Sequence, residues 1–175
     1  MHHIYHTQGL ILGGRGFGED SKYYYIFTRD IGMIYASASG VRKISSKLRF
    51  ILQDFSYINV DLVQGKDFWR ITTASKTGRL EELTKRPETL KVLVNIARLL
   101  RRLLPGTEQN EPLFDNTIQN LSLIEQAKSQ EEIEDLEVRT VLEILHKLGY
   151  IEGEKAINRT QAIALINKAL KETHL

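Results

Sequence analysis

The feature that most constrains the fold is a change in hydrophobic period partway along the chain. In the first 75 residues apolar and polar residues alternate, which is typical of β-strands with one buried face. The clearest case is residues 57–63, in which Ile58, Val60 and Leu62 share one face. From Arg86 onward the period becomes about 3.6 residues, that of an amphipathic helix. The chain is therefore expected to contain a β part followed by an α part.

The β part contains five candidate strands and one short candidate helix. The strands are expected over residues 7–12, 22–28, 33–39, 57–63 and 68–74. Residues 45–55 have helical spacing instead, and a serine at their start can cap the first turn. A helix between the third and fourth strands is the order of many OB-folds, which are small five-stranded barrels. The glycine-rich residues 13–18 precede a strand rather than a helix, which favours a hairpin connection over a phosphate-binding loop.

The α part is expected to hold about four helices. The first begins at Pro87, the second near Leu113, the third after Ser129 and the last after Asn158. Ser129 and a glutamate three residues later are spaced as a capping box. The fold class is thus α+β, with an N-terminal five-stranded OB-fold barrel followed by a small all-helical domain. We expect residues 1–80 to bind nucleic acid and residues 81–175 to bind protein.

Composition excludes several classes of function. The 175 residues include no cysteine, so disulfides, thiolate chemistry and zinc ribbons are excluded. The sequence shows neither a nucleophile motif nor a Ser, His and Asp set that the pattern brings together. His2, His3 and His6 cluster near the start, without a fourth ligand at suitable spacing. We expect no enzyme, no cofactor and no metal. The absence of a long apolar run indicates a cytoplasmic protein without membrane contact.

The distribution of charge points to phosphate-bearing ligands. Residues 1–80 carry a net charge of +5 and residues 81–175 a net charge of −3, although the whole chain is only +2. Cationic loops beside strand aromatics are the means by which OB-folds bind single strands. The predicted DNA-binding residues are Arg42, Lys43, Lys47 and Arg49, supported by Lys22, Arg70 and Arg15. Tyr23, Tyr25 and Tyr35 are candidates for base stacking, and Arg98, Arg101 and Arg102 form a separate basic face on the first long helix.

Several short segments, taken in order, resemble the RecO family of bacterial recombination mediators. Residues 8–12 resemble the strand that opens the family, and residues 18–22 its Gly-Glu hairpin. Residues 26–34 follow its Phe-Thr pattern, and Gly40-Val41-Arg42-Lys43 with residues 46–55 follow its next element. Residues 136–150 are similar to a segment of its helical domain. Many members carry a four-cysteine zinc site after that segment, so the resemblance identifies a short form that lacks it.

The resemblance implies a role in the RecF pathway of DNA repair and recombination. Members bind single- and double-stranded DNA through the OB-fold and anneal complementary strands. With RecR they help to load RecA on DNA coated by single-stranded-DNA-binding protein (SSB), whose acidic C-terminal tail they recognise in the helical domain. For that tail we expect contacts at Arg98, Arg101 and Arg102. The resemblance also implies a bacterial, nucleoid-associated protein.

Two other functions fit the same pattern. The acidic second part of the chain would also suit a protein–protein adaptor whose barrel does not bind DNA. An OB-fold protein that binds RNA would show the same cationic and aromatic residues. Binding of an oligonucleotide distinguishes a DNA- or RNA-binding protein from the adaptor. Competition between DNA and RNA strands of equal length distinguishes the DNA-binding function from the RNA-binding one.

Overall fold

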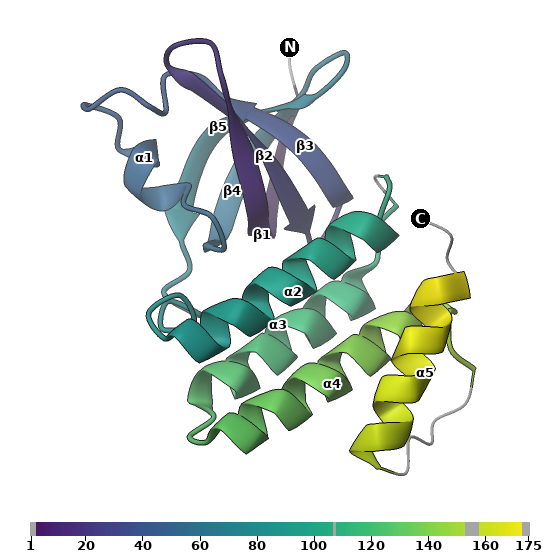
Figure 1. Ribbon diagram of the computed structural model, residues 1–175. Coiled ribbons are helices and arrows are strands. Elements are labelled where there is room, and N and C mark those ends of the chain that lie inside the picture. The colour runs from purple at the N-terminus through teal and green to yellow at the C-terminus, as the bar shows by residue number, and fades with distance from the viewer. Residues whose placement is uncertain (1–2, 107, 153–157, 173–175) are drawn as a thin grey trace.

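The computed structural model describes residues 3–106, 108–152 and 158–172. A small β-barrel occupies one end of the molecule, and a layer of long helices occupies the other (Figure 1). Helices α2 and α3 contact the barrel, α4 lies on their far side, and α5 packs against α4 at the side of the layer (Figure 1). This arrangement confirms the expected class, a barrel followed by helices.

Five strands form the barrel: β1 (Ile4–Phe17), β2 (Ser21–Thr28), β3 (Gly32–Ala38), β4 (Tyr57–Gln64) and β5 (Trp69–Lys76). Their order around the closed barrel is β1-β2-β3-β5-β4. All neighbours are antiparallel except β3 and β5, whose short parallel pairing joins Ala36 to Trp69 and closes the barrel. The five strands predicted from alternation are all present.

Strand β1 is longer than predicted, and the prediction that residues 13–18 form a hairpin connection is wrong for most of that stretch. The strand continues through Gly14 to Phe17, and only the turn at residues 18–20 connects it to β2. The register shifts between Ile11 and Gly13, where φ is +127°, a value that favours glycine. A Cβ on Gly14 would lie 2.6 Å from the carbonyl oxygen of Tyr23. The glycines therefore allow a bulge and a close approach inside the strand pair.

The barrel interior is an apolar core closed at one end by a short helix. Ile26, Ile58 and Leu62 are fully buried there. Helix α1 (Leu48–Ile51) packs both of its end residues against this core. It has four residues where eleven were predicted, because Leu52 already leaves helical geometry at ψ +59°. The predicted serine cap is also wrong: Lys47 occupies the N-cap position, without a side-chain hydrogen bond.

The long helices are α2 (Pro87–Leu103), α3 (Glu111–Gln126), α4 (Gln130–Lys147) and α5 (Arg159–Glu172). The predicted Ser129 cap of α4 is confirmed, and Asn158, after which the last helix is expected, caps α5. The Ser129 hydroxyl accepts a hydrogen bond from the backbone N–H of Glu132 at 3.1 Å, and the Asn158 side chain accepts one from Gln161 at 2.9 Å. Among the described residues no helix is both long and apolar enough to cross a membrane.

A second apolar core joins the barrel to the helices. Phe27 on the outer face of β2 meets Phe114 of α3 edge to face, with ring centroids 5.2 Å apart. At the rim of this contact Arg29 forms ion pairs with Glu111 and Asp115. One side of the barrel is thereby fixed against α2 and α3. The division of the chain into domains at residues 80 and 81 remains a prediction.

Candidate nucleic-acid interface

Five aromatic side chains form a row on the outer face of the barrel. Alternation along β2 places Tyr24 and Ile26 inside, and Tyr23 and Tyr25 outside. Strand register then brings Tyr35 of β3 opposite Tyr25. We call the row the aromatic ladder; its members are Phe17, Phe68, Tyr23, Tyr35 and Tyr25.

The rings of the ladder touch in sequence. Tyr23 and Tyr35 stack with centroids 4.8 Å apart and planes within 15°. Tyr35 and Tyr25 are also 4.8 Å apart, and Tyr23 further contacts Phe17 at 4.9 Å and Phe68 at 5.2 Å. The structure therefore brings together all three tyrosines predicted for base stacking. They are half-buried by one another, whereas Phe17 at one end is 57% exposed.

Two predicted DNA-binding cations lie beside the ladder. Arg15 is directly opposite Tyr23 in the pairing of β1 and β2, so the two side chains share the outer face. Arg70 is opposite Ser37 of β3 in the parallel pair, and Ser37 in turn is opposite Tyr23. Both arginines are exposed. Within the described part of the chain, neither forms an ion pair with a carboxylate.

The loop between β3 and α1 carries three cations of the central predicted cluster, the fourth, Arg49, lies in α1, and all four are exposed. The Arg42 backbone N–H donates to Asp20 at 2.9 Å, and its guanidinium donates to the Gly18 carbonyl at 3.2 Å. These bonds hold the loop against the turn between β1 and β2, next to the Phe17 end of the ladder. Lys43 is 3.6 Å from the carboxylate of Asp20. For Arg42, Lys47 and Arg49 no carboxylate partner exists among the described residues.

A shallow hollow at the α1 end of the barrel is lined by three of the predicted cations, Lys22, Arg42 and Arg49. Lys22 pairs with Asp54 at 3.0 Å, and its ammonium lies 4.9 Å from the ring centre of Tyr24. Burial, together with the nearby carboxylate of Asp54, raises the pKa of Tyr24 to about 12. Lys22 and Lys43 are thus the two predicted phosphate ligands whose charge is partly compensated inside the protein.

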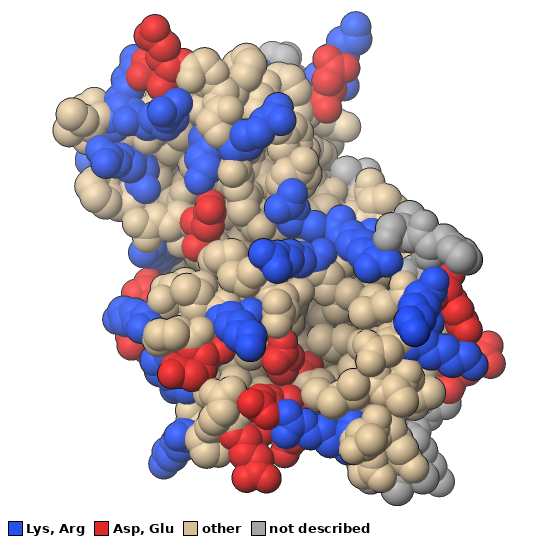
Figure 2. Space-filling view, viewed as in Figure 1, with Lys and Arg blue, Asp and Glu red and all other residues tan. Residues whose placement is uncertain are grey.

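The three arginines predicted on α2 have different environments. Arg101 reaches the barrel, where its guanidinium carbon lies 4.2 Å from the ring centre of Tyr25. Arg102 donates a hydrogen bond to the carbonyl of Leu170 in α5 at 3.2 Å. Arg98 is exposed on α2. The space-filling view shows Lys and Arg side chains over the barrel and along the junction with α2, whereas the acidic side chains gather mainly over the lower helices (Figure 2).

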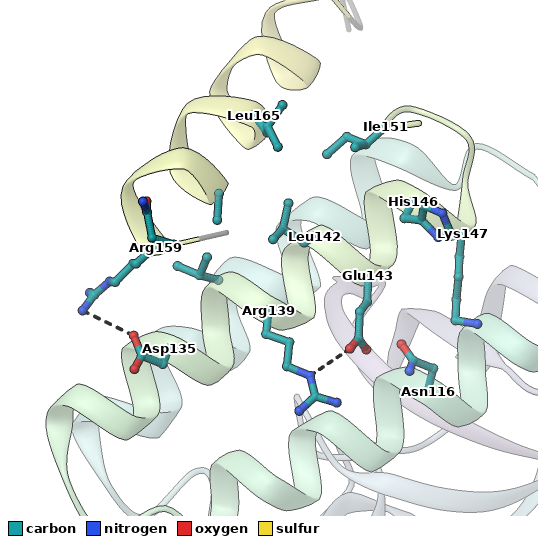
Figure 3. Close-up of a pocket in the computed structure, with 13 residues that line it drawn as sticks. Asn116, Asp135, Arg139, Leu142, Glu143, His146, Lys147, Ile151, Arg159 and Leu165 are labelled. Carbon is teal, nitrogen blue, oxygen red and sulfur yellow. Dashed lines mark hydrogen bonds and ion pairs between the residues drawn. The ribbon is translucent and has the colours of Figure 1, made fainter. Parts of the chain in front are cut away.

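A separate hollow of about 800 Å³ lies between α3, α4 and α5. Its wall combines apolar side chains such as Leu142, Ile151 and Leu165 with charged ones (Figure 3). Four of the charged side chains form two pairs: Arg139 bonds Glu143 at 2.9 Å, and Arg159 is 3.6 Å from Asp135 (Figure 3). Burial raises the pKa of Glu143, but hydrogen bonds from Arg139 and Asn120 outweigh it and the net shift is downward. The predicted tail contacts on α2 do not line this hollow.

The histidine cluster contains no metal site among the described residues. No group of three or more His, Asp or Glu side chains with metal-binding geometry occurs there. His6 instead bonds Asp61 at 2.6 Å on the face formed by β1 and β4. His2 lies outside the described residues.

Sequence reasoning missed two rings of the aromatic ladder and the contact of Arg101 with it. The sequence places Phe17 in a hairpin connection, and its alternation with Arg15 becomes visible only when the glycines are placed inside β1. Phe68 precedes β5, and no short-range pattern links it to Tyr23. Arg101 comes from a helix some 75 residues away in sequence, so its contact with Tyr25 depends on how α2 packs on the barrel.

The family model and the relatives that match this chain carry the same name. Residues 1–78 match the family described as Recombination protein O N terminal. Over 123 residues the chain is 32% identical to the DNA repair protein RecO of Desulfitobacterium hafniense, which covers 70% of this chain and 45% of that protein. Over 139 residues it is 31% identical to the DNA repair protein RecO of Alkaliphilus metalliredigens, covering 78% of this chain and 52% of that protein. The chain spans about half the length of these relatives.

Proposed function

We propose that this chain, which belongs to the RecO family, is a DNA-binding protein of bacterial DNA repair and recombination, and that it binds single strands on the outer face of its barrel. The observation that carries the proposal is the aromatic ladder flanked by exposed cations. OB-folds bind oligonucleotides on the face of their second and third strands and on the loops after the first and fourth strands. Here the tyrosines come from β2 and β3, while Phe17 and Phe68 adjoin those two loops.

The mode of binding follows from the side chains. Arg42, Lys47 and Arg49 attract the phosphate backbone, with Arg15 and Arg70 beside the ladder and Lys22 and Lys43 in support. Bases stack on the exposed ring of Phe17 and on the ladder behind it, because every base has an aromatic face whatever its identity. Binding of this kind is insensitive to sequence and weakens as salt rises.

Annealing would use the same charges, and duplex DNA would bind through them as well. When cations neutralise two phosphate backbones, repulsion between complementary strands falls and base pairing proceeds without any covalent step. Action with RecR in the loading of RecA, and recognition of the SSB tail by Arg98, Arg101 and Arg102, are further parts of the proposal. They are supported by family membership alone. A location in the bacterial cytoplasm at the nucleoid belongs to the same proposal.

The proposal is tested by fluorescence anisotropy with a labelled DNA strand of about 16 nucleotides, the upper site size of one OB-fold. Reversing both Arg42 and Lys43 to Glu is expected to weaken binding about equally for all sequences. The matched control reverses Lys168 and Lys171, which are exposed on α5. If the wild-type chain does not bind the strand at low salt, the adaptor function is favoured. If it prefers an RNA strand of equal length in competition, the RNA-binding function is favoured.

A further inference from the structure

We infer that Arg101 of α2 is a base-stacking residue of the single-strand site, so that the site continues from the barrel onto the helical part. The inference rests on the proposed function and adds to it a residue outside the barrel. A base would stack on the guanidinium of Arg101 in the same way as on the rings of the ladder. The strand would then run from Phe17 past the tyrosines to the surface of α2.

Arg101 extends the ladder by one flat group. Its guanidinium carbon lies 4.2 Å from the ring centre of Tyr25, which is a stacking or cation–π distance. Tyr25 in turn contacts Tyr35 at 4.8 Å, and the contacts continue through Tyr23 to Phe17. A guanidinium is planar and can stack on both faces, so one face can lie on Tyr25 and the other can receive a base.

The barrel leaves room for this side chain at a glycine. A Cβ on Gly13 would lie 3.6 Å from an Nη atom of Arg101. Gly13 is opposite Tyr25 in the pairing of β1 and β2, on the same outer face. A long side chain at that position would compete with Arg101 for the space over Tyr25. Gly13 and Arg101 therefore meet where the outer face of the barrel adjoins α2.

The charge of Arg101 is available to a ligand. Arg29 also joins the barrel to the helices, and it does so through two carboxylates, Glu111 and Asp115. Arg101 has no such partner among the described residues, nor has Arg98 three residues before it on the same helix. Both are exposed. Figure 2 shows further Lys and Arg side chains over the barrel and along its junction with α2.

A base-stacking role is distinguished from a purely electrostatic one by Arg101→Lys, which keeps the charge and loses the plane. Its affinity is measured for a DNA strand of about 16 nucleotides and for an abasic strand of the same length, which has phosphates but no bases. Lys91→Arg, which keeps the charge at an exposed position of the same helix, is the control. We expect Arg101→Lys to weaken binding of the normal strand about 5- to 150-fold, the range for the loss of one stacked base. Binding of the abasic strand, and both affinities of the control, should stay close to wild type.

Each other outcome has a definite meaning. If wild type binds the normal strand and Arg101→Lys binds it equally well, the inference is wrong while the proposed function stands. If Arg101→Lys weakens both strands alike, Arg101 supports the position of α2 and the inference is also wrong. If wild type binds neither strand, the proposed function fails and takes the inference with it.

Discussion

Replacing Phe17 with alanine separates binding from stability more cleanly than any other change to the aromatic ladder. Phe17 is the most exposed ring of the ladder and contacts Tyr23 with centroids 4.9 Å apart. If the ladder stacks bases, the ring of Phe17 is the one most accessible to a base of the bound strand. The substitution removes the platform and leaves the cations in place.

The expected magnitudes differ for the two properties. Truncation of a fully buried Phe costs about 3–5 kcal/mol of unfolding free energy, but Phe17 is 57% exposed and leaves no enclosed cavity. We therefore expect a loss of about 1 kcal/mol, close to the value of one aromatic pair. Stacking of one base contributes about 1–3 kcal/mol, so the affinity for a single strand should fall about 5- to 150-fold.

The assay is anisotropy titration with an oligonucleotide, combined with urea denaturation of the same protein samples. Phe50→Ala is the control, because Phe50 is 63% exposed on α1 and belongs to no ring pair of the ladder. The reasoning is refuted if Phe17→Ala binds as tightly as wild type, or if Phe50→Ala loses as much affinity as Phe17→Ala.

Three further predictions concern the framework that supports this face. Arg29 holds the pKa of Asp115 below its usual value, so the pair stabilises the fold above about pH 4. This stabilisation is lost as the pH falls through the lowered pKa. Arg29→Gln should therefore lower the denaturation midpoint at pH 6 more than at pH 2.5. The pKa of Tyr24 is raised to about 12, so its contribution to folding stability is complete below pH 10 and is lost as the pH rises from 10 to 12. Tyr24→Phe should therefore unfold less readily than wild type over that pH range. Equal alkaline unfolding of the two proteins would count against the raised pKa of Tyr24. A Cβ at Gly14 would lie 2.6 Å from the Tyr23 carbonyl oxygen, so Gly14→Ala should lower the unfolding free energy by about 1–3 kcal/mol. A Cβ at Gly106 would meet nothing within 4 Å, so Gly106→Ala should have little effect on thermal stability.

Local pattern predicted the fold because each element agrees with its own sequence signal. In β4 the alternating Ile58, Val60 and Leu62 are all buried, as their spacing requires. The helix caps at Ser129 and Asn158 depend on contacts within three residues, so the sequence contains the whole signal. Local pattern places the glycines of β1 in a connection, because their role depends on the backbone of β2 across the strand pair. That proximity is not encoded in neighbouring residues.

The candidate site could be predicted only in part, for a related reason. Charge and aromatic content identified Arg42 and the three tyrosines, which share loops or strands near each other in sequence. Strand register was needed to place Arg70 near Tyr23, and packing of α2 on the barrel was needed to place Arg101 on Tyr25. Ion pairs with nearby carboxylates determine which cations have their charge compensated. For example, Lys22 is paired with Asp54, which lies in the segment after α1. Such pairings depend on tertiary structure.

The most direct test of the central claim is the salt dependence of single-strand affinity. If about four phosphates are neutralised by the basic residues around the barrel, the logarithm of the association constant should fall with the logarithm of salt concentration at a slope of roughly −3. Reversal of Arg42 and Lys43 should make that slope shallower. Binding that does not change with salt, or no binding at low salt, would contradict the account.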